Sequence, residues 1–534
     1  MNVGATASPR LLDIGARWDE IFTGPPDRAM IVSGDRKISV AECDRITSQI
    51  ARTLIAQGAG KDTIVALSLK PRLDTVLAMI GVSRAGAAFC VVPPSYPQRR
   101  IEHIKKVINP VADITALDEV MGDAGAVSSA PRDPDCLAYV IFTSGTTGSP
   151  KAVEIEDRSL MYIVDQPDLY VGTGIAQMAA LQFDACIWEI FGGLLNGMTV
   201  HLLEVESILD PQTASEALQG VDSMFVTTQL FNRLAQRVPS VFDLVSFIAF
   251  GGERVSPTHV GLVAGRTRIA HMYGPTEATV YATSYDVVPP IGEDVPLGSP
   301  LSGVQVLLCD QKGDLVPDGT DGEACIGGPG VMRGYRGDPE ETAKVILLKD
   351  GQRFYRTGDI MRRRPDGLLY YVERCDRQTK VNGFRIDLGE IESVANQTPG
   401  VTGAVATVTD GKLSCYVTGD ATVAAVRNTV RSELPEYSVP IIAWVPEIPL
   451  GPTGKTDVQE LARLAHLTIA RTHLYGAVTD VLGVTDPDPH KTFVELGGDS
   501  IAAMDVVWRL DKQGVMADVM SLLVDPLTEV RIDA

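Results

Sequence analysis

The chain has 534 residues, more than a single hydrophobic core usually holds, so several packed units are expected. Hydrophobic residues make up 45% and charged residues 22% of the sequence, which excludes a wholly disordered or fibrous chain. Acidic residues outnumber basic residues by 68 to 47, and the net charge of −21 argues against a basic nucleic-acid-binding surface.

The eight cysteines are scattered, and their spacing fits neither a zinc site nor a disulfide framework. We therefore expect free thiols in a reducing cytoplasm. The N-terminus lacks an uninterrupted apolar stretch of secretory length. The best candidate for a membrane span, residues 76–92, carries Arg84 at its middle, so we interpret it as a buried helix and strand.

Up to about residue 370, short apolar runs alternate with helical patterns and Gly/Pro turns, which predicts α/β layers. Residues 137–142, 224–227 and 247–250 are expected to form buried strands.

A loop of small and hydroxylated residues follows the first of these strands directly. Its glycines let the backbone approach a ligand, its hydroxyl groups can cradle phosphate oxygens, and its lysine adds a positive charge. The spacing differs from a Walker A loop, and on these residues alone a phosphate loop and a flexible turn are about equally favoured. The residues are Thr143, Ser144, Gly145, Thr146, Thr147, Gly148 and Lys151.

Four further motifs each allow a chemical and a structural interpretation. Tyr273 and Glu277 flank a Gly-Pro turn, where they could stack on a base and hold Mg²⁺. Asp359 follows a glycine and could accept both hydroxyls of a ribose. Lys455, in a glycine-bounded loop, could act as a mobile cation. Ser500 begins an amphipathic helix pattern, where it could carry a phosphopantetheine arm or only cap the helix.

The C-terminal third differs from the rest in its charge and in its residue patterns. A highly charged stretch begins near residue 373, and two strand patterns and a helix pattern over 404–434 predict a small α+β unit ending near Asp457. Residues 458–467 are expected to form a linker or linking helix. The acidic tail from about residue 470 fits a small helical bundle.

Taken together, the order and spacing of these motifs resemble the adenylate-forming superfamily. Within it, they resemble the amino-acid adenylation domains of nonribosomal peptide synthetases followed by a peptidyl carrier domain. Residues 183–191, 251–253, 322–328 and 380–392 match as well, and the resemblance runs from about residue 14 to the end.

The resemblance implies an α/β fold with a large, multi-subdomain adenylate-forming N-terminal domain over residues 1–375. A small α+β C-terminal domain over 376–458, a linker over 459–469 and a helical-bundle carrier (thiolation) domain over 470–534 would follow. Asp376 would be the hinge residue, and Glu373 departs from the glycine usual before Arg374.

By the same resemblance, the large domain binds ATP and a carboxylic substrate. The loop 143–151 would hold the β- and γ-phosphates, Thr276 would touch the α-phosphate, and Glu277 would ligate Mg²⁺. Lys455 would bridge the substrate carboxylate and the phosphate, and Ser500 would carry 4′-phosphopantetheine. The adenosine would be held by Gly251, Gly252, Glu253, Tyr273, Asp359 and Arg374.

The substrate side chain is expected to lie below Asp184, which would pair with the α-ammonium group. Phe250 would stand where roomy pockets have Gly or Ala, so we expect a small aliphatic L-amino acid such as 2-aminobutyrate, alanine or valine. The lining would be Ala185, Trp188, Phe225, Ile248, Phe250, Met272, Val280 and Tyr281.

The expected partners are the amino acid, a phosphopantetheinyl transferase, and a downstream condensation or tailoring enzyme of natural-product biosynthesis. The need for a small MbtH-like accessory protein stays open, and neither nucleic acid nor membrane is expected. Two alternatives remain: an acyl- or aryl-coenzyme A ligase of the same superfamily, and a non-catalytic scaffold that presents a carrier.

Overall fold

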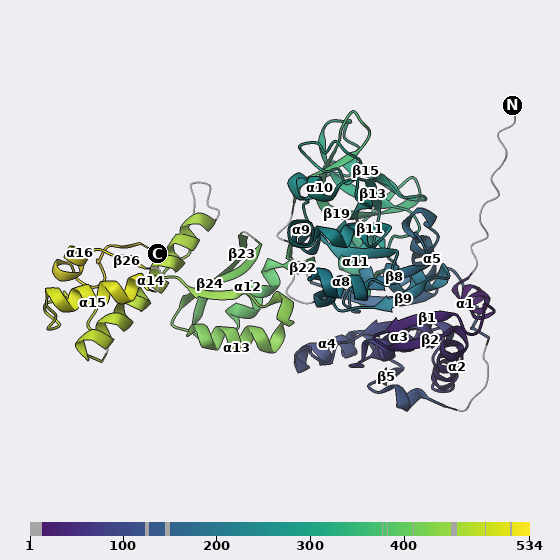
Figure 1. Cartoon of the computed structure of the whole chain (residues 1–534), viewed down its shortest axis with the longest axis horizontal. Coiled ribbons are helices and arrows are strands. Elements are labelled where there is room, and N and C mark those ends of the chain that lie inside the picture. Colours follow the sequence, from purple (N-terminus) through teal and green to yellow (C-terminus); the bar gives the residue numbers. More distant parts are fainter. Residues whose placement is uncertain are drawn as a thin grey trace. The chain divides into compact units, whose positions relative to one another are not determined.

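The computed structural model describes residues 13–122, 128–144, 150–375, 378–381, 383–409, 411–449, 456–485, 487–512 and 515–533. The chain divides into two compact units, Met1–Asp387 and Leu388–Ala534 (Figure 1). No helix within the described ranges combines the length and the apolar character that a membrane crossing requires.

A nine-stranded sheet forms the centre of the first unit. Its six inner strands are mutually parallel, and antiparallel strands close both edges. In spatial order the strands are β14 (Ser299–Pro300), β13 (Thr283–Asp286), β12 (Arg268–Tyr273), β11 (Phe247–Gly251), β10 (Ser223–Thr227), β8 (Gly174–Gln177), β9 (Thr199–Leu202), β1 (Ala29–Ser33) and β2 (Arg36–Ser39).

A six-stranded sheet lies in the same unit. Its strands in spatial order are β17 (Gly334–Tyr335), β7 (Lys151–Glu156), β6 (Leu137–Thr143), β4 (Ala88–Val91), β3 (Ile64–Leu67) and β5 (Ala112–Ile114). The largest core joins residues of both sheets to helices α2 (Val40–Ala56), α3 (Arg72–Arg84) and α5 (Asp157–Val164).

Helix α3 is buried on every face from Thr75 to Arg84, as expected for a helix packed in the interior of a large domain. Its Arg84 is 2% exposed and pairs with Asp44 at 2.8 Å. The apolar stretch 76–92 is therefore a buried helix followed by β4, as predicted.

The outer faces of the two sheets carry their own helices. Helices α8 (Pro211–Ala217), α9 (Thr228–Arg237) and α10 (Pro257–Val263) build a second core against the large sheet (Figure 1). Helix α4 (Gln98–Ile108) packs on the six-stranded sheet through Ile104 and Ile108, and α1 (Ile14–Phe22) joins the main core through Trp18.

A third, antiparallel sheet completes this unit. It consists of β15 (Gln305–Cys309), β16 (Asp321–Gly327), β18 (Ile346–Lys349), β19 (Gln352–Arg363) and β20 (Leu369–Arg374), with α11 (Pro339–Val345) leading into it. The hairpin of β21 (Gln378–Val381) and β22 (Phe384–Asp387) ends the unit.

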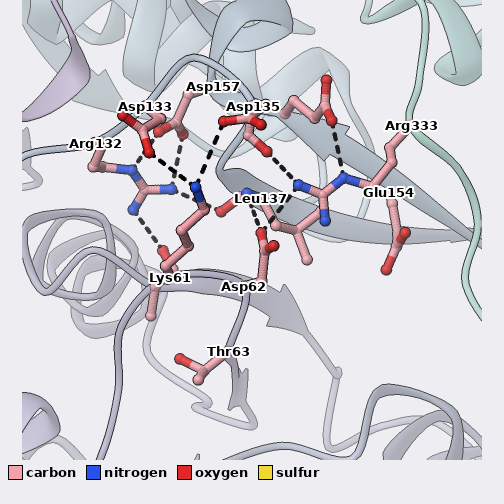
Figure 2. A network of polar contacts seen from close by, with 12 residues as sticks. Lys61, Asp62, Thr63, Arg132, Asp133, Asp135, Leu137, Glu154, Asp157 and Arg333 are labelled. Atoms are coloured by element: carbon pink, nitrogen blue, oxygen red, sulfur yellow. Dashed lines mark hydrogen bonds and ion pairs between the residues drawn. The ribbon is translucent and has the colours of Figure 1, made fainter.

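Charged side chains hold the start of β6, the strand that leads into the loop 143–151 (Figure 2). Arg132 forms a bidentate pair with Asp157, and it also donates to the Leu137 carbonyl at 2.7 Å. On the other side, Asp62 accepts from the Leu137 amide at 2.9 Å and from Arg333 at 3.0 Å. The strand therefore enters the site from a fixed position.

The second unit contains an α+β part and a helical part joined by one helix. Helix α14 (Val458–Leu482) is 25 residues long. Leu461 and Ala465 pack with Tyr416 and Val445, whereas Leu474 belongs to the core of the helical part. The predicted linker 459–469 is thus part of a continuous helix.

The elements of the second unit agree with the strand and helix patterns of the sequence. The α+β part consists of α12 (Leu388–Asn396), β23 (Val401–Thr409), β24 (Lys412–Gly419), α13 (Val423–Glu433) and β25 (Ile441–Trp444). The helical part adds α15 (Ser500–Asp511), β26 (Met516–Ala517), α16 (Val519–Val524) and β27 (Ile532–Asp533) to α14.

Candidate active site

The site lies at the carboxyl ends of the parallel strands, where open α/β sheets usually bind ligands. Here β12 ends in Tyr273, and the chain turns into a short 3-10 helix that carries Glu277. Gly274 is required at this turn, because an added Cβ would lie 2.4 Å from the Val280 carbonyl oxygen.

Glu277 is fully buried and accepts three hydrogen bonds. Tyr335 donates its hydroxyl at 2.9 Å, and Arg385 reaches both carboxylate oxygens, at 3.0 and 2.7 Å. Burial alone would raise the pKa of Glu277, but the Arg385 charge and these hydrogen bonds hold it below its ordinary value. An ionised carboxylate in a buried site is a ligand that Mg²⁺ prefers, so the donor fits the ion predicted here.

Asp359 on β19 contacts two of the other residues predicted to hold the adenosine. Tyr273 donates its hydroxyl to one carboxylate oxygen at 2.6 Å, and Arg374 donates to the other at 2.7 Å. The structure therefore brings these three residues together, although they lie 86 and 15 positions apart from Asp359 in the chain.

The hairpin β21–β22 packs beside these residues, and Gln378 on β21 accepts a hydrogen bond from Arg374 at 3.1 Å. The Gly383 amide donates to Glu253 at 2.6 Å, and an added Cβ on Gly383 would lie 2.6 Å from Thr227. Phe384 contacts Phe183, with 4.7 Å between ring centroids, and Ser144 donates to the Arg385 carbonyl at 3.0 Å. Arg385 and Gly383 lie within the matching stretch 380–392, but no role was assigned to them from the sequence.

Lys380 on β21 adds a second cation to this region. Burial lowers the pKa of Lys380, and the charges of Asp359 and Asp184 partly oppose that effect. Burial likewise raises the pKa of Asp184, opposed by a hydrogen bond from Thr276 and by the charge of Lys380. Thr276, predicted to touch a phosphate, thus acts on the pKa of Asp184 in this structure.

The predicted phosphate loop is described only at its two ends. Thr143 ends β6, and Lys151 begins β7, where it pairs with Glu341 at 2.8 Å and lies over the Tyr335 ring. Gly145, Thr146, Thr147 and Gly148 lie outside the described residues, as do Asp376 and Lys455.

The segment after Asp184 is one irregular helix, in which Trp188–Gly192 form a π-helical turn between two short α-helical pieces. Such turns are frequent at functional sites. Trp188 meets Tyr281 edge to face with 6.1 Å between centroids, and Phe225 lies 6.0 Å from Tyr281. Ala185 begins this helix, and Val280 precedes Tyr281 with a positive φ of 66°.

Strand alternation separates the predicted pocket residues into two groups. Phe225 and Met272 share the core that contains Trp188 and Tyr281, together with Ala249. Ile248 and Phe250 belong to the core on the opposite face, where Phe250 stacks on Phe231 with 4.1 Å between centroids. The prediction that Phe250 narrows the pocket is therefore wrong, because successive side chains of a strand point to opposite faces.

The strand positions on the pocket face are Ala249 and Gly251. Gly251 pairs in register with Met272, and an added Cβ would lie 2.1 Å from the Met272 carbonyl oxygen. Gly252 has φ of 101°, which favours glycine, and Glu253 follows it. Gly251 is thus both one of the residues predicted to hold the adenosine and the last residue of β11, on the strand face that carries Ala249.

In the second unit, Ser500 is the exposed first residue of α15. The helix is capped by Asp499, whose carboxylate accepts from the amides of Ile501 and Ala502 at 3.0 and 2.8 Å. Gly498 is required before it, since an added Cβ would lie 2.2 Å from the Phe493 ring. Asp499 therefore caps the helix, and Ser500 is exposed on the surface.

Models of two known protein families match this chain. Residues 18–128 and 110–336 match the family model of AMP-binding enzymes. The chain belongs to the AMP-binding enzyme family. Residues 473–526 of this AMP-binding enzyme match the model of a phosphopantetheine attachment site, and they include Ser500. The two matches imply ATP, Mg²⁺ and 4′-phosphopantetheine as the associated groups.

Curated relatives of this AMP-binding enzyme include bacitracin synthase 1 of Bacillus licheniformis and tyrocidine synthase 3 of Brevibacillus parabrevis. Each is 31% identical over alignments that cover 95% of this chain. The chain spans only 11% and 8% of their respective lengths.

Among solved structures, PA1221, an NRPS protein containing adenylation and PCP domains, is 26% identical with a TM-score of 0.74 over 85% of this chain and 97% of that chain. Its holo form, bound to a vinylsulfonamide inhibitor, is 25% identical with a TM-score of 0.75 over 94% and 92%. The α/β fold with a C-terminal carrier domain is therefore shared with an adenylation–carrier pair.

Proposed function

We propose that this chain is the adenylation–thiolation part of a nonribosomal peptide synthetase. It activates an amino acid as aminoacyl-AMP and then transfers the aminoacyl group to the phosphopantetheine thiol on Ser500. The observation that carries the proposal is one site that joins Glu277 to the Asp359, Tyr273 and Arg374 cluster, in a chain with a phosphopantetheine attachment site.

In the first step, a carboxylate oxygen of the amino acid attacks the α-phosphorus of ATP, and the bond to pyrophosphate breaks. Bound Mg²⁺ would supply positive charge that offsets the repulsion between two anions. Glu277 would hold the ion, Asp359 and Arg374 would orient the ribose, and Lys455 would balance the charge that develops.

In the second step, the thiol sulfur attacks the acyl carbon, AMP leaves with the bonding electron pair, and the thiol proton goes to solvent. Lys455 must leave the site for this step, and Asp376 is the proposed hinge. Ser500 stands on the exposed start of α15, where a phosphopantetheinyl transferase can reach it.

The substrate proposal rests on Asp184 and the rings near it. Asp184 would bind the α-ammonium group, and no charged side chain is among Trp188, Phe225, Met272 and Tyr281. An uncharged amino-acid side chain therefore fits. The narrower expectation of a small aliphatic side chain depended on Phe250, which packs on the other face of the sheet.

The partners follow from the chemistry. The chain would meet a phosphopantetheinyl transferase, and a downstream condensation or tailoring enzyme would receive the loaded amino acid in the cytoplasm. A small MbtH-like accessory protein is tested most directly by expressing the chain with and without one and comparing the yield of active enzyme.

ATP–pyrophosphate exchange with a panel of amino acids, fatty acids and aryl acids tests the proposal. We expect exchange with at least one amino acid, and none with the matching hydroxy acid, because Asp184 needs a cationic partner. Preferred exchange with a fatty or aryl acid would indicate a coenzyme A ligase. Absence of exchange with every acid, for protein that binds MgATP, would indicate a scaffold.

A further inference from the structure

Two polar atoms in the aromatic wall of the site lack a hydrogen-bond partner among the described residues: the indole nitrogen of Trp188 and the hydroxyl of Tyr281. Trp188 is fully buried and Tyr281 is 4% exposed. Buried polar atoms nearly always have a partner, so each such exception needs an explanation. Here both exceptions come from rings that contact each other edge to face.

Both rings are fixed in place. Trp188 stacks on Tyr170, whose own hydroxyl donates to the Ile163 carbonyl at 2.8 Å. Tyr281 follows two left-handed residues, Thr279 with φ of 56° and Val280 with φ of 66°. A β-branched residue rarely adopts this conformation, and such strain persists only where the surrounding structure imposes it.

The strained turn is held by hydrogen bonds on both sides. Thr279 donates its hydroxyl to the Gly330 carbonyl at 2.7 Å, and the Tyr281 carbonyl accepts from Tyr162 at 2.9 Å. These hydrogen bonds fix the backbone from which the Tyr281 ring projects. Burial and the contact with Trp188 hold the ring itself, so the unpartnered hydroxyl is in position before any ligand arrives.

The strand residues that share the core of these two rings are apolar. Phe225, Ala249 and Met272 supply carbon and sulfur surface in the same core. Binding sites commonly combine such apolar walls with a few placed polar groups that fix the ligand's orientation. Burial raises the pKa of Tyr281, and the nearby charges of Glu189 and Asp184 add to that effect, so a further negative charge is disfavoured here.

We infer that the amino acid activated here carries an uncharged hydrogen-bonding group on its side chain, a hydroxyl or a carboxamide. Its oxygen accepts a hydrogen bond from the Trp188 indole N–H, and it pairs with the Tyr281 hydroxyl. The inference rests on the proposed adenylation function, and it makes Trp188 and Tyr281 the residues that determine specificity.

The test compares amino acids of equal shape in ATP–pyrophosphate exchange: threonine with valine, asparagine with leucine, and tyrosine with phenylalanine. The polar member of at least one pair is expected to exceed its apolar isostere in kcat/KM by about 10²-fold or more. Preference for the apolar member in every pair that exchanges would overturn the inference and leave adenylation standing. Failure of every amino acid to exchange would overturn the proposed function instead.

Variants that remove each polar atom distinguish recognition from packing. Tyr281→Phe removes one oxygen atom, and it should lower the kcat/KM ratio of the polar amino acid to its isostere by about tenfold or more. Trp188→Phe removes the indole N–H together with part of the ring, and it should lower the same ratio. Tyr170→Phe removes a hydroxyl from the neighbouring ring and serves as the matched control, which should not change the ratio between the isosteres. If Tyr281→Phe leaves the ratio unchanged as well, a buried water rather than the substrate satisfies the hydroxyl, and the inference is wrong.

Discussion

Glu277 illustrates how one carboxylate can serve two states of a site. Its burial would favour the neutral form, yet its pKa lies below the ordinary value because Arg385 supplies a compensating charge. The same oxygens fit Mg²⁺, which prefers carboxylate ligands. The ion and the guanidinium therefore compete for one group, and we expect the hairpin that carries Arg385 to withdraw when MgATP binds.

Arg385→Ala should consequently bind MgATP more tightly than the unaltered protein. Hydrogen bonds to a charged group contribute about 1.5–3 kcal/mol, so the gain in affinity should reach about tenfold. Calorimetric titration with the magnesium complex of a non-hydrolysable ATP analogue at pH 8 measures it. Arg336→Ala, which breaks the ion pair with Glu154, is the matched control. Unchanged affinity in both variants would contradict competition at Glu277.

Glu189 is a second buried carboxyl group, and it should make the stability of the protein depend on pH. The residue is fully buried, and burial raises its pKa to about 7 against the opposing hydrogen bonds from the amides of Met178 and Ala179. The folded protein therefore holds this proton more tightly than the unfolded chain does. The resulting stabilisation is complete below about pH 4.5 and is lost as the pH rises through about 7.

Glu189→Gln should remove this contribution, which amounts to about 3 kcal/mol between those pH values. Urea unfolding of both proteins at several pH values measures the difference between their free energies of unfolding. Glu216→Gln, on an exposed position of α8, should retain the pH dependence of the unaltered protein. Parallel curves for all three proteins would show that Glu189 does not titrate in this range.

Among the secondary-structure elements, the sequence pattern predicted where the strands lie but not to which face of the sheet each side chain points. Residues 247–250 were predicted as a strand, and β11 spans Phe247–Gly251. All five of its residues are buried, so apolar side chains occupy both faces and no alternation shows which face meets Trp188. A shift of one residue therefore leaves no trace in the sequence pattern, and only the packing partners of Phe250 reveal it.

Phe250→Ala should destabilise the protein without changing the preferred amino acid. Truncating a buried phenylalanine costs about 3–5 kcal/mol, and Phe250 stacks on Phe231 and His271 away from the site. Phe225→Ala, on the pocket face of the neighbouring strand, should change the preference at a smaller cost because Phe225 is only half-buried. Urea unfolding and exchange assays measure the two effects. A changed preference in Phe250→Ala would instead support the sequence-based prediction that Phe250 lines the substrate pocket.

At the scale of the whole molecule, motif order predicted a large α/β domain, a small α+β part and a carrier, and the structure contains all three. The boundary expected at residue 376 differs from that of the compact units, which meet at Asp387. The reason is the hairpin β21–β22, which bonds to Glu253 and Glu277. Contacts made through space between distant segments, such as this one, leave no local pattern in the sequence.

Ser500→Ala should separate the two half-reactions. Pyrophosphate exchange should stay within about twofold, because the serine takes no part in adenylation, and covalent loading of the amino acid should disappear. Lys455→Ala should slow exchange by about 10²-fold or more, the scale of losing a charge that stabilises a transition state. Mass spectrometry of the intact chain measures loading. Loss of exchange in Ser500→Ala would contradict the assignment of the two parts.

The continuity of helix α14 limits how the carrier part of such a chain can be exchanged. Its first turns complete the core around Tyr416, and Leu474 completes the core of the carrier, with no loop between them. One inserted residue would turn Ala470 and Leu474 by about 100° around the helix axis relative to Leu461. A carrier grafted from another protein must therefore be joined in the correct helical phase, and a junction chosen by sequence similarity alone leaves that phase to chance.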